Sequence, residues 1–133
     1  MYSAKLAIAS TAMSLWALSV GAATVTPTEA MGQVGHTAKV CGVVASAVYE
    51  AGARAHPTFL TMISADQPNA NRALTAVIYG TDRAKFGTPE IALQGQRVCV
   101  TGFVSFFRQR PEMILSDPRQ LSFVGPQSVA ELR

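Results

Sequence analysis

The sequence contains few of the residues that build metal centres and redox sites. It has two cysteines and two histidines among 133 residues, and Cys41 and Cys99 do not form a Cys-x-x-Cys motif. Structural zinc sites need several such ligands at close spacing, so no metal ion is expected, and a redox-active thiol pair is equally disfavoured. No other cofactor is predicted.

Charged side chains are also scarce, and neither sign dominates strongly. They make up 14% of the residues, with 11 basic and 8 acidic side chains and a net charge of +3. A balance this mild is compatible with ordinary solubility and does not require a polyanionic partner. Charge alone therefore leaves the class of partner open.

No pattern typical of a catalytic centre is found. The acidic residues are scattered through predicted turns and strand ends, without the spacing of a two-metal site. His36 and His56 fall on separate predicted loops, and no Ser/His/Asp order, phosphate-binding glycine loop or nucleophilic-cysteine motif is present. The sequence therefore favours a non-catalytic binding domain, with no catalytic residues assigned and a minimal nuclease as an alternative.

The N-terminus has the three parts of a secretory signal peptide, predicted over residues 1–23. Lys5 supplies the positive charge, an apolar stretch of 15 residues follows from Leu6 to Val20, and Gly21-Ala22-Ala23 provides small residues for cleavage after Ala22 or Ala23. A retained anchor is the alternative, but the stretch is shorter than the roughly 20 residues that span a bilayer. We expect a periplasmic or secreted protein with no stable membrane anchor after signal cleavage.

The remaining chain is predicted to be all-β. Val- and Ala-rich segments with period-two alternation predict five strands, and a short helix is expected between the third and fourth. This order is typical of a five-stranded OB-type Greek-key barrel. We therefore expect an N-terminal lead-in at residues 24–35, an OB-fold domain at 36–124 and a C-terminal tail at 125–133. The predicted strands are Thr37–Val48, Thr58–Ile63, Ala73–Tyr79, Gln96–Phe107 and Glu112–Leu115, and the helix is Thr81–Phe86.

The two cysteines fall on the first and fourth predicted strands, which are neighbours in an OB-type barrel. Cys41 alternates with Val40 and Gly42, and Cys99 alternates with Val98 and Val100, so both thiols share the face opposite the predicted core. A shared face on adjacent strands is what a cross-strand disulfide requires, and an exported protein meets an oxidising compartment. A Cys41–Cys99 disulfide is therefore expected, and two unpaired cysteines are the alternative.

Several segments resemble the small OB-fold domains of exported bacterial proteins, similar to the nucleic-acid-binding module attached to some secreted nucleases. The resemblance covers about residues 35 to 121, and no catalytic domain accompanies it within these 133 residues. It implies nucleic-acid binding without catalysis. The matching segments are His56–Leu60, Asp66–Asn69, Thr75–Arg83, Phe86–Gly87, Leu93–Gly102 and Arg110–Leu121.

Barrels that bind oligonucleotides combine a basic groove with aromatic stacking platforms. Adjacent Phe106 and Phe107 must point to opposite faces of their strand, so one of them is expected to be exposed, next to two arginines. Core packing of the aromatic residues and plain surface charge are the alternative interpretations. A protein, an oligosaccharide or a small molecule is the alternative ligand, as for a periplasmic binding or stress protein. The candidates for binding single-stranded nucleic acid are Phe59, Tyr79, Phe107, Arg108, Arg110, Arg54 and Lys39.

Overall fold

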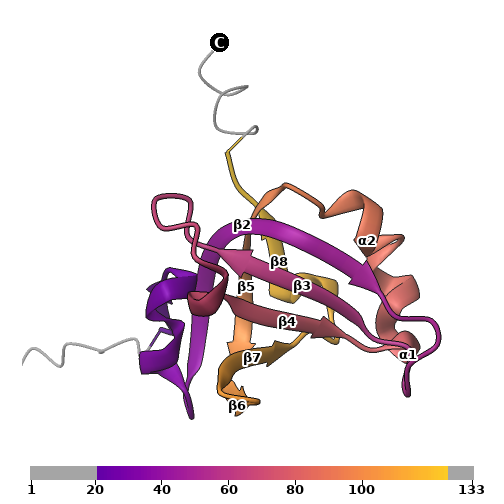
Figure 1. The fold of residues 1–133 in the computed structure, drawn as a ribbon, viewed down its shortest axis with the longest axis horizontal. Helices are drawn as coiled ribbons and strands as arrows, with labels where there is room; N and C mark the ends of the chain where they lie inside the picture. The colour runs from indigo at the N-terminus through magenta and orange to yellow at the C-terminus, as the bar shows by residue number, and fades with distance from the viewer. Residues whose placement is uncertain (1–20, 126–133) are drawn as a thin grey trace, which may run out of the picture.

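The computed structural model describes residues 21–125. The predicted signal peptide, residues 1–23, therefore lies almost entirely outside the described residues, as does the predicted tail, residues 125–133. Within the described range, eight strands and several short helical turns follow one another (Figure 1). These are β1 (Ala23–Val25), η1 (Pro27–Gln33), β2 (Thr37–Tyr49), β3 (Thr58–Ile63), η2 (Ala70–Arg72), β4 (Leu74–Ile78), α1 (Gly80–Arg83), η3 (Ala84–Phe86), α2 (Pro89–Ala92), β5 (Arg97–Phe103), β6 (Ser105–Phe107), β7 (Arg110–Ile114), η4 (Pro118–Gln120) and β8 (Leu121–Phe123).

The long strand β2 organises the sheet. Residues 37–43 pair antiparallel with β5, and residues 43–49 pair antiparallel with β3. The register with β3 shifts between Val44 and Ser46, a β-bulge that increases the local bend of the strand. Figure 1 shows β2 curving over the rest of the sheet, so that one strand contributes to both sides of the core.

The strand order is β6-β7-β4-β3-β2-β5-β8, with β1 parallel to β2. Strands β2, β3, β4, β5 and β7 take the places of the five predicted strands, and the helical turns lie between β4 and β5, as predicted. The fold is OB-like. Two details of the prediction are corrected: the sheet has eight strands instead of five, and it is not closed, because β6 and β8 remain its edges.

The predicted alternation places the core correctly. Val40 and Val44 of β2 and Val98 and Val100 of β5 are all fully buried, whereas Arg97 is exposed. Burying one such side chain contributes about 1.5–3 kcal/mol relative to leaving it exposed. The apolar residues at alternate positions of these two strands therefore all lie on the side of the sheet that faces the core.

The predicted long strand Gln96–Phe107 is two strands, and the break falls at Val104. Its amide N–H donates to the carbonyl of His36 and its carbonyl accepts from the N–H of Gly35, at 2.9 and 2.8 Å. Val104 is fully buried, so the turn before β2 satisfies its backbone groups while the side chain remains in the core. The chain can then change direction into β6.

Residues 24–35, the predicted N-terminal lead-in, fold against the rest of the sheet through the helical turn η1. Thr26 and Glu29 form a capping box at the start of η1, and Ala30 is fully buried in the core. Pro27 packs directly against Gly42. A Cβ added at Gly42 would lie only 2.6 Å from the Cγ of Pro27. The absence of a side chain at Gly42 lets the N-terminal segment approach β2, a long-range contact that local sequence patterns do not reveal.

The helical turns between β4 and β5 are more extensive than predicted. Gly87 adopts a φ of 74°, which ends η3 and allows the additional turn α2. Arg83 forms an ion pair with Glu90 and lies over the Tyr49 ring, with 3.9 Å between its Cζ atom and the ring centroid. These contacts attach the helical segment to the end of β2.

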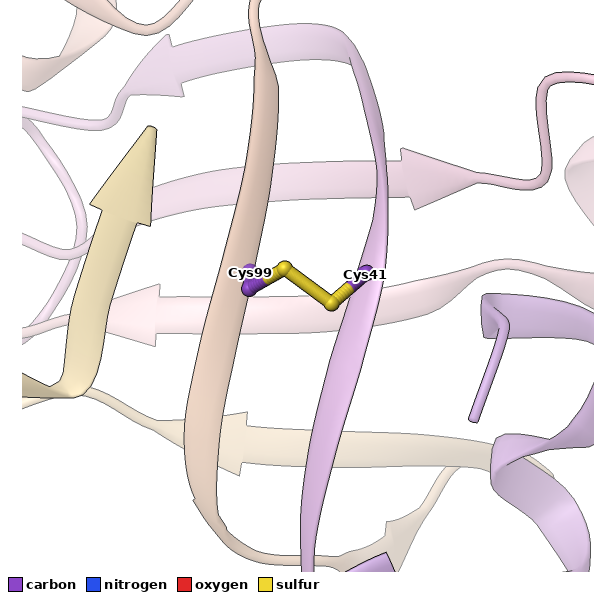
Figure 2. Close-up of a disulfide and its surroundings, with 2 residues drawn as sticks. All are labelled: Cys41 and Cys99. Atoms are coloured by element: carbon purple, nitrogen blue, oxygen red, sulfur yellow. A yellow bond between two sulfur atoms is a disulfide. The ribbon is translucent and has the colours of Figure 1, made fainter. Parts of the chain in front are cut away.

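The predicted disulfide is confirmed. Cys41 and Cys99 are direct cross-strand partners in the β2–β5 ladder and are joined by a disulfide bond, with their Cα atoms 4.0 Å apart (Figure 2). The bond connects residues separated by 58 positions in the sequence. It fixes the register of β2 against β5 on the side opposite the buried valines.

Candidate nucleic-acid interface

One groove crosses the sheet from the β2–β3 loop to the β6–β7 hairpin, with a volume of about 760 Å³. Strands β3 and β4 form its floor, and the loop and the hairpin form its two walls. In OB folds, the face of the second and third strands, together with the adjoining loops, binds oligonucleotides and oligosaccharides. The lining residues are Ala53, Arg54, Pro57, Phe59, Thr75, Val77, Tyr79, Phe107, Arg108, Arg110, Pro111 and Glu112.

The strand registers explain why these side chains share one face. Phe59 of β3 is the direct partner of Val77 in β4, and Thr75 of β4 is the partner of Glu112 in β7. Direct partners in a sheet project to the same side. Side chains from three strands therefore point into the same groove, and Phe107, opposite Arg110 at the end of the hairpin, extends this face.

The groove brings together six of the seven residues that the sequence singled out. The aromatic candidates Phe59, Tyr79 and Phe107 all line it, as do the three arginines 54, 108 and 110. Lys39 does not. It lies on β2 between Thr24 of β1 and Thr101 of β5, at a different part of the sheet.

The hairpin that carries Phe107 and Arg108 has an unusual turn. Phe107 pairs with Arg110, so only Arg108 and Gln109 connect β6 to β7, and their φ angles are 49° and 67°. Positive φ at both central positions is the pattern of a type I′ turn, which Asn-Gly adopts at low cost and Arg-Gln does not. The Cζ atom of Arg108 lies 5.2 Å from the centroid of the Phe107 ring, a cation–π contact at the groove wall.

The β2–β3 loop on the opposite wall is held in place by backbone contacts. Ala55 and His56 also have positive φ values, 66° and 45°. The carbonyl of Ala55 accepts a 2.9 Å hydrogen bond from the N–H of Gly80, where a Cβ would lie 2.9 Å from the Cβ of His56. Gly80 therefore permits the loop to pack against the start of α1, which positions Arg54 at the edge of the groove.

The groove is mainly positive, with one acidic group. Arg54, Arg108 and Arg110 form no ion pair with any residue in the range 21–125. Glu112 is partly buried, and this burial raises the pKa of its carboxyl group above the ordinary value. Three unpaired guanidinium groups and one carboxylate therefore face any ligand in this groove.

Glu112 is the lining residue with ionisable chemistry that the sequence reasoning missed. The sequence does contain a usable signal, because Glu112 follows Arg110 by two positions on one strand and must share its face. Arg83 does not line the groove. Its guanidinium group forms an ion pair with Glu90 and lies over the ring of Tyr49.

Among residues 21–125, no three His, Cys, Asp or Glu side chains gather closely enough to hold a metal ion. The same part of the chain contains no helix that is long and apolar enough to cross a membrane.

Comparison with known proteins shows the fold alone. No protein-family model and no curated protein sequence matches this chain. A chain of the yeast Stn1–Ten1 structure is similar with a TM-score of 0.56 and 12% identity, covering 84% of this chain and 67% of that one. The asparaginyl-tRNA synthetase of Entamoeba histolytica is similar with a TM-score of 0.55 and 13% identity, covering 79% of this chain. This protein spans only 24% of the synthetase chain.

A bacterial lipoprotein from Klebsiella pneumoniae, provisionally assigned as nucleic-acid-binding, is also similar. Its TM-score is 0.50 at 18% identity, covering 74% of this chain and 79% of that one. The similarity of these structures shows a shared OB-like architecture. At identities this low it says nothing about the ligand, which must be argued from the groove itself.

Proposed function

We propose that this protein is an exported, non-catalytic OB-type domain that binds single-stranded nucleic acid in the groove between the β2–β3 loop and the β6–β7 hairpin. The observation that carries the proposal is the gathering of three aromatic residues and three unpaired arginines in one groove. Bases stack on aromatic rings, and guanidinium groups bind phosphates, so the groove offers both halves of such an interface.

The groove favours single strands over duplexes. Stacking on Phe59, Tyr79 or Phe107 needs an unpaired base whose face is accessible. The Phe107 side chain is 54% exposed although it is large and apolar, so its ring is available to a ligand. The similarity in fold to a provisionally assigned nucleic-acid-binding lipoprotein supports the same ligand class.

Export is part of the proposal and is supported by the disulfide. Disulfides persist in oxidising compartments such as the periplasm and are rare in the cytosol. The test is to express the chain with its own N-terminus in a Gram-negative host and to measure the mass of the protein in each cell fraction. We expect a periplasmic protein that begins at residue 23 or 24. Full-length protein in the cytosol would contradict export.

Binding is tested with the oxidised protein and fluorescent oligonucleotides at low and moderate salt. We expect affinity for single strands that falls steeply with salt, and a decrease of about tenfold for Phe107→Ala, because stacking contributes roughly 1–3 kcal/mol per base. Phe103→Ala is the matched control: Phe103 is 57% exposed but lies outside the groove, so its removal should leave affinity unchanged.

The arginines are tested in the same assay. Arg108→Ala should weaken binding and reduce the slope of log affinity against log salt by about one. Lys39→Ala is the control. It removes a charge outside the groove, so the affinity should change only slightly. If no oligonucleotide binds even at low salt, or if oligosaccharides bind in their place, the proposed ligand class is wrong. Cleavage of the oligonucleotides during the assay would contradict a non-catalytic role.

A further inference from the structure

Glu112 carries the one carboxylate among the residues that line the groove, and its negative charge would repel a phosphate bound beside it. Glu112 is on β7, and its direct neighbours across the sheet are Thr75 of β4 and Ser105 of β6. Its side chain is partly buried and forms no hydrogen bond or ion pair with the described residues. An acceptor-only group with free lone pairs is therefore present on the groove wall between two strands.

The three arginines have a different distribution. Arg54 lies on the β2–β3 loop and Arg108 at the tip of the β6–β7 turn, and Arg110 begins β7 next to that turn. Phosphates should be attracted to these guanidinium groups at the loop end of the groove, whereas the carboxylate, two positions further along β7 than Arg110, should repel them. A bound strand would then direct a base, and not its backbone, toward Glu112.

From this arrangement, and resting on the proposed function, we propose that Glu112 selects guanine in the bound strand by accepting hydrogen bonds from its Watson–Crick edge. Guanine presents two neighbouring donors there, the ring N1–H and the N2 amino group, which match the two oxygens of a carboxylate. Single-stranded RNA and DNA are commonly read on this edge by protein side chains.

The other bases fit the carboxylate less well. Cytosine and adenine each place one amino donor next to a ring nitrogen that accepts hydrogen bonds, so they offer one favourable contact and one repulsion. Thymine and uracil have a single N–H donor between two carbonyl oxygens, both of which face the carboxylate unfavourably. Guanine is therefore preferred most strongly over thymine and uracil.

The test compares three oligonucleotides of equal length: alternating guanine and thymine, alternating inosine and thymine, and thymine alone. Affinities are measured at pH 8 and low salt, well above the range in which carboxyl groups are protonated. We expect the guanine-containing strand to bind about tenfold more tightly than the thymine strand, the scale of a bidentate base contact. Inosine lacks the N2 amino group, so it should lose most of this preference without any change to the protein.

Glu112→Gln tests the protein side of the contact. It should reduce the guanine preference to less than about threefold and strengthen binding of the thymine strand, because the repulsive charge is removed. Asp66→Asn is the matched control, since it removes one acidic charge outside the groove and should retain the preference. Equal affinity for all three strands, or a preference that is unchanged in Glu112→Gln, would overturn this inference alone. Failure of every strand to bind would overturn the proposed function as well.

Discussion

Cys41 and Cys99 are direct cross-strand partners on β2 and β5, with 4.0 Å between their Cα atoms, and their disulfide joins these two strands. The bond lies on the opposite side of these strands from the fully buried Val40 and Val100. Covalent and hydrophobic contacts thus hold the same pair of strands from both sides.

Removal of the disulfide should lower stability strongly. The bond closes a loop with a sequence separation of 58 residues, for which the chain-entropy model predicts about 4 kcal/mol. We expect Cys41→Ala/Cys99→Ala to lower the free energy of unfolding in urea by about that amount. Treatment with a reducing agent should lower the stability of the wild-type protein by a similar amount. The same treatment should not change the stability of the double variant. An equal urea midpoint for the oxidised and reduced wild-type protein would contradict this expectation.

Much of the β-structure follows from local pattern. Period-two alternation identified the buried sides of β2 and β5, and hence placed Cys41 and Cys99 on a common face. The break at Val104 was not predicted, because Val104 continues the apolar alternation while its backbone bonds to residues far away in the sequence. The packing of Pro27 on Gly42 was missed for the same reason.

The candidate groove was predictable in part. Residue type singled out Phe59 and Phe107, and both line the groove. Strand phase did not separate Phe107 from Phe106: only one of the two was expected to be exposed, but they are 54% and 55% exposed. Lys39 was included by residue type alone, because its charge does not reveal which strands lie beside it; its neighbours are Thr24 of β1 and Thr101 of β5, away from the groove. Glu112 was passed over because a carboxylate was considered only as a catalytic or metal-binding group.

Gly42→Ala should destabilise the protein through the N-terminal segment. A Cβ at this position would lie 2.6 Å from both the Cγ of Pro27 and the backbone carbonyl oxygen of Ile63, so the backbone must shift. Overpacking of this kind costs about 1–3 kcal/mol, measurable as a lower urea midpoint. Gly32→Ala is the matched control, since nothing lies within 4 Å of its Cβ position. Equal stability of the two variants would contradict the close approach of Pro27 and Ile63 to Gly42.

The ion pair between Asp117 and Arg119 should lower the pKa of Asp117 measurably. The side chain of Arg119 donates to both carboxylate oxygens, and this holds the pKa of Asp117 down at about 2. Because the pKa in the folded state is depressed, the stabilisation is complete above the ordinary value and is lost as the pH falls through about 2. Arg119→Gln should raise the pKa of Asp117 in a carboxyl NMR titration. Arg97→Gln is the control and should leave it unchanged; an equal shift in both variants would exclude a specific effect of Arg119.

Gln109→Gly should make the protein more stable without weakening its groove. Gln109 has a φ of 67°, a conformation that costs about 1–2 kcal/mol for a residue with a side chain and nothing comparable for glycine. Its side chain is not part of the groove lining, whereas that of the neighbouring Arg108 is. We therefore expect the free energy of unfolding to rise by about 1 kcal/mol while oligonucleotide affinity stays within a factor of two. Gln67→Gly is the control, because Gln67 is exposed and has no positive φ, so glycine should give no gain there. If Gln109→Gly stabilises the fold but lowers affinity, the strained turn itself orients Arg108 and Phe107 for binding; if it lowers stability, the two-residue turn described here is wrong.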